Sequence, residues 1–266
     1  LDLLSKQKDI EPVVAHFDHG IRSESQKDRI FVEKLAKRYK KQFFYEEGNL
    51  GPDASEATAR EARYKFLSKI VEQTKSRAIV TAHHQDDVIE TALINLLRGT
   101  SAKGLGALKS TDEIKRPLLN QEKAELIKYA NKNDLKWIED ETNEDEKYLR
   151  NYIRKKLITK FSESDKKKML KIIKKSIITT DEIGKIISEI IPAHDSIERS
   201  EIVKMSHAVA LEYLSGWLSQ RKLKIDKKTL NRLVIALKTA KPASTIEINK
   251  NHVFKIESNI IYLKKK

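Results

Sequence analysis

Two histidines and three carboxylates gather in the segment Ile79–Gly99, IVTAHHQDDVIETALINLLRG. A β-branched apolar run leads into this polar cluster, and a helical pattern follows it. If the run is a strand, the cluster lies at the strand's carboxyl end, where open α/β sheets bind ligands. His83, Asp87 and Glu90 are spaced by four and three residues, so one helical face would carry all three. Such a face suits a nucleotide or a metal ion.

Helix capping is the competing explanation for the same cluster. Acidic residues in the first turn of a helix complement its dipole and need no further function. Capping accounts for Asp86 and in part for Asp87, but it leaves unexplained the two histidines and Glu90 in the second turn. We therefore favour a functional cluster, in which the carboxylates and an imidazole, His83 or His84, coordinate Mg²⁺ or position a phosphate.

Two further sets of polar residues lie nearer the start of the chain. In HFDHGIR, the second candidate set is His16, Asp18, His19 and Arg22. Strand alternation puts His16 and Asp18 on one side, and an arginine beyond a strand end suits a phosphate, although an ordinary polar loop explains this segment equally well. In SEATAREARYKFL, Arg60 and Arg63 share one helical face. Arginine binds phosphate or carboxylate in a bidentate manner, but in isolation a solvated charged face is the better explanation for this pair.

A fourth set, Arg150, Asn151 and Arg154 in NEDEKYLRNYIRKKL, follows a change in the pattern of the chain. The two arginines lie one helical turn apart at the junction of two expected domains, and clefts between domains are common ligand sites. A generic basic helix is the competing account.

The elements that must position these residues alternate between strand and helix in the first half. Strands are predicted at 11–17, 42–46, 78–82, 116–119 and 136–139, and helices at 28–39, 53–73, 85–98 and 120–131, with Asp53 and Asn120 as caps. This alternation predicts a parallel sheet with helices on both faces. Later segments are helical at 146–191, 201–218 and 226–239, before short strands at 245–249, 253–257 and 260–263. We predict an α/β fold: a Rossmann-like parallel-sheet domain over residues 1–158, then a smaller, mainly helical domain over 159–266 with a terminal β-meander.

Composition narrows the class of protein. The 266 residues carry a net charge of +14 and contain no cysteine. The charge favours an anionic partner such as nucleic acid, although a generally lysine-rich composition would give the same balance. Disulfides and cysteine-based metal sites are excluded. No apolar run is long enough to span a bilayer and no signal peptide is visible, so we expect a cytoplasmic protein without a membrane partner.

Five segments, taken in order, resemble the tRNA(Ile)-lysidine synthases of the PP-loop ATP pyrophosphatase superfamily. They are HFDHGIRSES, SEATAREARYKF, TAHHQDDVIETALINLLRGTSAKGLGAL, IKRPLL and WIEDETNEDEKYLRNYIR. The resemblance runs over about Val13–Leu157. Any one segment alone would be weak, but five in the right order with short spacers are specific.

The resemblance implies a ligase that modifies tRNA. Members of this family use ATP and Mg²⁺ to adenylate cytidine 34 in the CAU anticodon of tRNA(Ile), and they release pyrophosphate. Free L-lysine then displaces AMP to form lysidine. A homodimer is compatible with the resemblance, and the basic helical half would contact the tRNA backbone.

The resemblance also implies roles for individual residues. The catalytic residues would be His83, Asp87 and Glu90, with Asp87 as a metal ligand. The nucleotide would be bound by His16, Asp18, Arg63 and His84. The substrate or tRNA would be contacted by Arg60, Arg150 and Arg154.

The chain departs from the family in one respect, because the SGGxDS loop that cradles pyrophosphate is not in the sequence. We expect that loop just upstream of Leu1, which falls within a helical pattern, so we expect an N-terminal truncation. We also expect that the 266 residues alone do not hydrolyse ATP at a useful rate. The alternatives are a non-catalytic tRNA-binding protein without the loop and a metal-dependent phosphohydrolase. A tRNA-thiolating relative is disfavoured because cysteine is missing.

Overall fold

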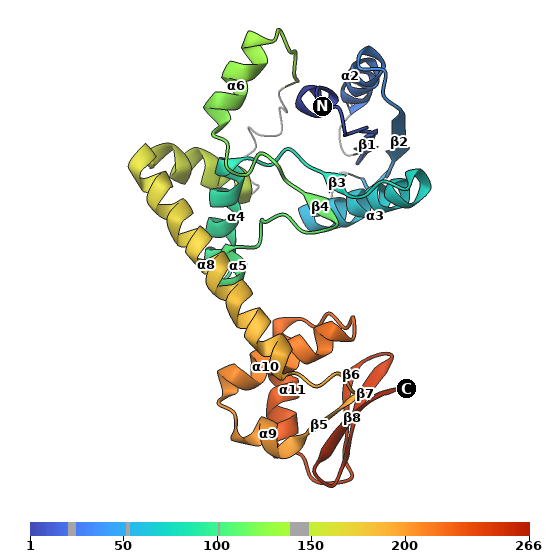
Figure 1. Cartoon of the computed structure of the whole chain (residues 1–266), viewed down its shortest axis with the longest axis vertical. Helices are drawn as coiled ribbons and strands as arrows, with labels where there is room; N and C mark the ends of the chain where they lie inside the picture. Colours follow the sequence, from blue (N-terminus) through green and yellow to red (C-terminus); the bar gives the residue numbers. More distant parts are fainter. Residues whose placement is uncertain (21–24, 52–53, 101, 139–148) are drawn as a thin grey trace. The chain divides into compact units, whose positions relative to one another are not determined.

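The structure is a computed structural model, and it describes residues 1–20, 25–51, 54–100, 102–138 and 149–266 (Figure 1). The chain divides into two compact units, Leu1–Ile173 and Lys174–Lys266. No helix in the described ranges is long and apolar enough to cross a membrane.

Unit 1 alternates strands and helices in its first half, as the sequence predicts. Its strands are β1 (Val14–Asp18), β2 (Phe43–Glu47), β3 (Ile79–Val80) and β4 (Ile114–Lys115). Its helices are α1 (Asp2–Ser5), α2 (Ser25–Arg38), α3 (Glu56–Thr74), α4 (Gln85–Leu97), α5 (Ala102–Leu105), α6 (Lys123–Lys132) and α7 (Leu149–Tyr152). A π-helical turn (Ile153–Leu157) and a 3₁₀ turn (Ile158–Lys160) then lead to α8 (Glu163–Ile190).

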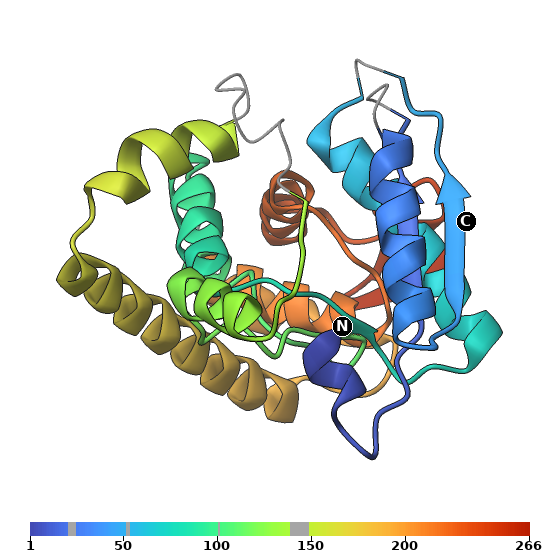
Figure 2. The ribbon, with the colours of Figure 1, turned by 90° about the horizontal axis from the view of Figure 1, so that it is seen from above.

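The strands of unit 1 pair in parallel, which confirms the predicted fold class. β1 pairs with β2 from Val14 opposite Phe43 to Asp18 opposite Glu47, and β3 pairs with β4. Among the described residues these strands form two separate two-stranded sheets. α2 packs along β1 and β2, and α3 also contacts β1 (Figure 2).

Two apolar clusters hold the elements that carry the polar residues. Phe17 of β1 packs with Phe66 and Ile70 of α3. Ile89 of α4 and Ile153 of the π-helical turn belong to the second cluster. α3 and α4 are therefore each anchored by a buried face, and their polar faces are held in place.

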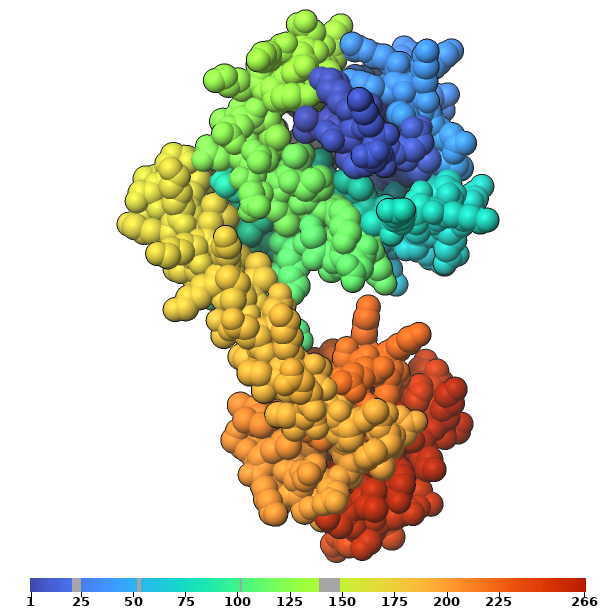
Figure 3. All heavy atoms as spheres, viewed as in Figure 1, coloured from blue at the N-terminus to red at the C-terminus, as the bar shows by residue number. Residues whose placement is uncertain are grey.

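The N-terminal residues are tied to α6. The Asp2 carboxylate accepts hydrogen bonds from the hydroxyl groups of Tyr39 (2.8 Å) and Tyr129 (2.6 Å). Lys6 donates to Tyr129 (3.0 Å) and to the side chain of Asn133 (3.1 Å). In Figure 3 the first residues (dark blue) accordingly lie against α6 (green).

Several local expectations need correction. α3 is capped by Ser55, whose Oγ accepts from Thr58 N at 3.1 Å; the predicted cap, Asp53, lies outside the described residues. The N-cap residue of α6 is Glu122 and not Asn120, because the chain turns at this point, where Gln121 N donates to Leu118 O at 2.9 Å, and the helix begins only after the turn.

Two predicted strands of the first half also differ. The strand expected at 116–119 is formed instead by β4, at 114–115, because Pro117 has no N–H to donate to a ladder. Within the part of 136–139 that the structure describes, residues 136–138, no strand is formed.

The boundary between the units lies within α8, beyond the boundary predicted after residue 158. The reason is that Phe161, just before α8, and Met169 and Leu170 in its first half pack into the second apolar cluster of unit 1.

Unit 2 combines the C-terminal part of α8 and three further helices with an antiparallel sheet. The three further helices are α9 (Arg199–Lys204), α10 (His207–Gln220) and α11 (Lys227–Thr239). The strands are β5 (Ser196–Glu198), β6 (Thr245–Asn249), β7 (His252–Glu257) and β8 (Ile260–Lys265), in the order β5-β8-β7-β6. The predicted meander is confirmed, and β5 extends it. The single helix predicted at 201–218 is two helices, because Ser206 caps a new one by accepting from Val209 N at 3.3 Å.

Candidate functional site

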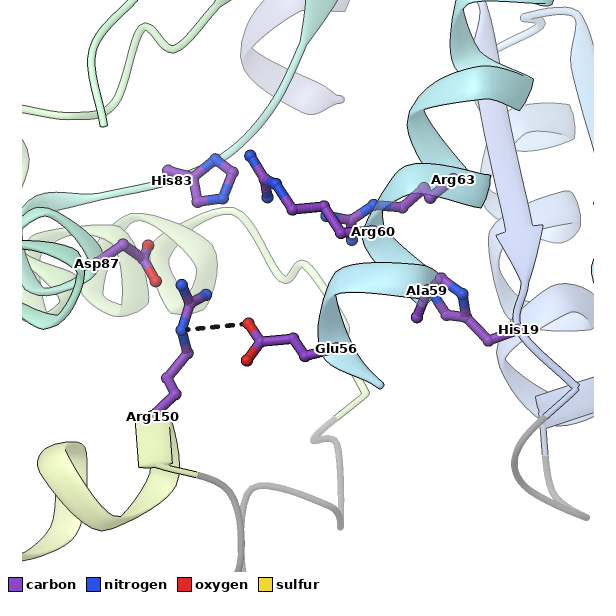
Figure 4. Close-up of a pocket in the computed structure, with 8 residues that line it drawn as sticks. All are labelled: His19, Glu56, Ala59, Arg60, Arg63, His83, Asp87 and Arg150. Carbon is purple, nitrogen blue, oxygen red and sulfur yellow. Dashed lines mark ion pairs between the residues drawn. The ribbon is translucent and has the colours of Figure 1, made fainter. Parts of the chain in front are cut away.

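A cavity of about 220 Å³ lies in unit 1 where four segments of the chain meet. Its walls come from His19 directly after β1, from α3, from the turn between β3 and α4 together with the first turn of α4, and from α7. It is lined by His19, Glu56, Ala59, Arg60, Arg63, His83, Asp87 and Arg150 (Figure 4).

The cavity collects five of the ten residues to which the resemblance gave a catalytic or binding role. Arg60, Arg63, His83, Asp87 and Arg150 line it. His19, a member of the HFDHGIR set, lines the cavity as well, together with Glu56 and Ala59, for which the sequence predicted no site role.

The turn between β3 and α4 serves both as a helix cap and as a cavity wall. Asp87 Oδ2 accepts from His84 N at 2.8 Å, which closes the first turn of α4. The same Asp87 lines the cavity. Capping and a functional position are therefore compatible, since the second carboxylate oxygen is not used by the cap. His84 itself is the N-cap residue and is not among the lining residues.

Glu90 and Arg154 form a paired unit behind Asp87. Arg154 Nε donates to Glu90 Oε1 at 2.6 Å, and Nη2 donates to Oε2 at 3.0 Å. Glu90 is fully buried, and burial raises the pKa of its carboxyl although Arg154 acts to lower it. Arg154 Nη2 also lies 3.8 Å from Asp87 Oδ1. Glu90 therefore holds Arg154 beside Asp87, and it is not a lining residue.

The cavity is rich in guanidinium groups. Arg60 and Arg63 extend from α3, and Arg60 reaches toward His83 (Figure 4). Burial lowers the pKa of Arg63. On the other side, Arg150 Nε lies 3.8 Å from Glu56 Oε1, so this ion pair is a loose one. Three arginines and two carboxylates line the cavity. This excess of positive charge suits a polyanion such as a phosphate chain, whose oxygens can each accept hydrogen bonds from a guanidinium group.

His83 enters the cavity as a neutral imidazole. Its Nδ1 lies 2.8 Å from Thr81 Oγ1. Burial lowers the pKa of His83 to about 4; Asp87 opposes this shift, whereas Arg116, Arg60 and Arg63 add to it. At neutral pH the ring therefore carries no charge.

His16 and Asp18 are engaged with β2 and are not among the lining residues. The His16 ring stacks on Tyr45, with ring centres 6.1 Å apart. Asp18 is buried and accepts from Gly20 N (2.9 Å) and from Tyr45 Oη (3.4 Å). Alternation along β1 predicted that His16 and Asp18 lie on the same side of the strand. It could not predict that Tyr45 of the neighbouring strand contacts both of them. Arg22 of the same motif lies outside the described residues.

The cavity offers few side chains that could bind a metal ion. Within the described ranges, no three histidine or acidic side chains are grouped to hold a metal. Asp87 contributes one carboxylate to the cavity. Mg²⁺ usually binds through one or two carboxylates and takes its other ligands from water and substrate phosphates. Asp87 therefore fits a magnesium ion that arrives with a nucleotide, and fits poorly a site made by protein alone.

Comparisons with known proteins give the family and the fold. The family model described as the PP-loop domain matches residues 1–161. The chain is 41% identical over 160 residues to the tRNA(Ile)-lysidine synthase of Thermus thermophilus, covering 58% of this chain and 31% of that protein. It is 26% identical over 276 residues to the tRNA(Ile)-lysidine synthase of Francisella tularensis, covering 98% of this chain and 69% of that protein.

The similarity to the Thermus protein covers less than a third of that protein's length. Among solved structures, the U34-tRNA thiolase NcsA from Methanococcus maripaludis with its [4Fe-4S] cluster superposes with a TM-score of 0.54. That match has 14% sequence identity and covers 66% of this chain and 64% of the thiolase. It supports a common fold.

Proposed function

The chain belongs to the PP-loop domain family, and from that membership we propose that it is the ATP-using part of a cytoplasmic tRNA(Ile)-lysidine synthase. In the proposed reaction, ATP adenylates cytidine 34 of the CAU anticodon and releases pyrophosphate. The ε-amine of free L-lysine then attacks C2 of that base and displaces AMP.

The observation that carries this proposal is the convergence of three motifs on one cavity. The motifs SEATAREARYKF, TAHHQDD and YLRNYIR supply, in turn, the α3 arginines, His83 with Asp87, and Arg150. The three motifs are far apart in the chain, and packing of the apolar core does not require their charged side chains to meet. Their meeting is what a nucleotide site requires.

The arginines suit the phosphates of ATP. Adenylation concentrates negative charge at the α-phosphate, and cations fixed in advance stabilise that charge without reorganisation. We assign phosphate contacts to Arg63, and contacts with the phosphates or the tRNA substrate to Arg60 and Arg150. Arg154, held by Glu90, would contact substrate from the same side as Asp87. His16, Asp18 and His84 stay proposals for the nucleotide side.

The carboxylate suits the amine and the metal. Lysine arrives as an ammonium and must lose a proton before it attacks. Asp87 is the acidic group of α4 that lines the cavity, so we assign it to attract the ammonium or to hold Mg²⁺. When bound, Mg²⁺ neutralises charge on the phosphates of ATP.

The tRNA would be held mainly by charge. Lysine and arginine exceed acidic residues in the part of the chain from residue 146 onward, which accounts for the net charge of +14. Contacts with phosphate supply a large share of affinity in nucleic-acid complexes and make it depend on salt. The anticodon bases are reachable because they are unpaired.

The test follows the fate of ATP. The full-length gene product is incubated with ATP, lysine and a tRNA(Ile) transcript bearing the CAU anticodon, and AMP is quantified. We expect AMP only when tRNA is present, and we expect Arg63→Ala to raise the KM for ATP about tenfold. Arg77→Ala is the matched control, because Arg77 is exposed and lies away from the cavity. Release of AMP at the same rate with and without tRNA would reject the proposal.

A further inference from the structure

Thr81 fixes the position of the His83 ring. Thr81 directly follows β3, and its backbone N donates to Lys115 O at 3.0 Å, which continues the β3–β4 pairing by one residue. Its Oγ1 lies 2.8 Å from His83 Nδ1. The sheet therefore places the hydroxyl, and the hydroxyl places the imidazole that lines the cavity.

Hydrogen-bond accounting gives the direction of this bond. A neutral imidazole has one donor nitrogen and one acceptor nitrogen, and a threonine hydroxyl has one hydrogen to give. If Thr81 donates to Nδ1, the hydroxyl hydrogen and the ring acceptor are both satisfied. In the reverse direction the hydroxyl hydrogen would need another acceptor, and His83 is the side-chain partner that the described part of the chain offers it. Donation by Thr81 satisfies both groups within the protein, whereas the reverse direction would leave the hydroxyl hydrogen to solvent, so we take Nδ1 as the acceptor and place the ring hydrogen on Nε2.

The charged groups around the ring keep it neutral. Asp87 faces it from α4, and Arg60 and Arg63 face it from α3. Arg116, almost fully buried at 7% exposure, adds a positive charge from the residue after β4. Burial and three guanidinium groups disfavour an imidazolium more than one carboxylate favours it, and they hold the pKa of His83 at about 4.

We propose that His83 acts as a neutral hydrogen-bond donor, giving its Nε2 hydrogen to a phosphoryl oxygen in the cavity, and that Thr81 is the positioning residue that sets this tautomer. The phosphoryl ligand rests on the proposed function, whereas the tautomer rests on the contacts of Thr81 alone. With Nδ1 occupied and Nε2 protonated, the ring has no free lone pair to accept a proton from the lysine ammonium. That task then falls to Asp87, which leaves His83 to stabilise developing charge.

The tautomer is tested directly by ¹⁵N NMR on the 266-residue chain at neutral pH. We expect the ring shifts of His83 to show a hydrogen on Nε2, and Thr81→Val, which removes the hydroxyl at similar shape, to produce a mixture of tautomers. Thr81→Ser should restore the wild-type spectrum. His207, whose Nε2 bonds to Asn231 Oδ1 at 2.9 Å, serves as the internal control and should not change. A wild-type ring with its hydrogen on Nδ1 overturns the proposal.

The donor role is tested in the full-length gene product with three substitutions. His83→Gln keeps a donor near the Nε2 position, His83→Asn keeps one near Nδ1, and His83→Ala keeps neither. Loss of one donor to a developing charge typically costs about 10²-fold in rate, so we expect Ala and Asn to lose about that much and Gln to recover at least tenfold. Equal loss in all three variants refutes the donor role. Should the wild-type enzyme form no lysidine, the proposed function fails, but the NMR result still decides the tautomer.

Discussion

The Glu90–Arg154 pair is unequal in burial, and this inequality predicts an unequal response to substitution. The side chain of Glu90 is 1% exposed, whereas that of Arg154 is 33% exposed. Arg154→Met leaves a buried carboxylate without its bidentate partner, whereas Glu90→Gln leaves a guanidinium that still reaches water. Breaking a buried ion pair costs about 3–5 kcal/mol. We expect Arg154→Met to cost about 3 kcal/mol, at the low end because the arginine is partly solvated, and Glu90→Gln to cost about 1 kcal/mol.

The two variants should also differ in their response to pH. Burial already raises the pKa of Glu90 above its usual value in the wild-type protein, and removal of Arg154 raises it further. In Arg154→Met the folded state then binds a proton more tightly than the unfolded state does, so the free energy of unfolding increases as pH falls. The cost of Arg154→Met should therefore shrink between about pH 7 and pH 5, whereas the double variant with Glu90→Gln should show no such recovery.

The assay is urea unfolding at both pH values, with circular dichroism as the readout. All variants carry Trp137→Phe, so that Trp217 is the remaining tryptophan. Trp217, which is fully buried in unit 2, then reports unit 2 by fluorescence, and its midpoint should not move. Equal costs for the two single variants at pH 7, or a cost for Arg154→Met that is unchanged at pH 5, would refute this reasoning.

Three other predictions concern stability. Although burial opposes it, hydrogen bonds from Lys6 and two tyrosines lower the pKa of Asp2 to about 2; Asp2→Asn should cost about 1–2 kcal/mol at neutral pH and should weaken the loss of stability seen on acidification from pH 4 to pH 2. Ser55→Ala removes the cap on Thr58 N and should cost about 1 kcal/mol in urea unfolding, whereas Ser55→Asp should not. Phe254→Ala empties a fully buried position of unit 2 and should cost about 3–5 kcal/mol, measured by Trp217 fluorescence.

Local pattern predicted most of the elements because it reports which residues each element buries. The apolar periodicity before Gly99 predicted α4 closely, and Gly99 ends it at φ +69°. Alternation predicted the terminal meander for the same reason. Pattern was weakest where an element is too short to show a period, as with β4 and β5, which span two and three residues.

The site was predictable in its residue types but not in its pairings. Spacing predicted that His83 and Asp87 share a helical face; His83 instead precedes the N-cap of α4, but both side chains line the cavity. The same spacing included Glu90, but its carboxylate pairs with Arg154 and does not line the cavity. Glu56 was missed because its partner, Arg150, is distant in the chain and joins it only when α3 and α7 pack in unit 1. Pairings of this kind depend on how elements meet, which local periodicity does not encode.

The central claim is that this cavity serves lysidine formation, and it is tested most directly by mass spectrometry of nucleosides. The full-length gene product is incubated with ATP, L-lysine and tRNA(Ile), and the tRNA is digested and analysed at position 34. The account predicts a cytidine-plus-lysine nucleoside that depends on both ATP and lysine and is lost in Asp87→Asn but retained in Arg77→Ala. An unmodified cytidine 34 under conditions in which the protein is folded and binds the tRNA would contradict it.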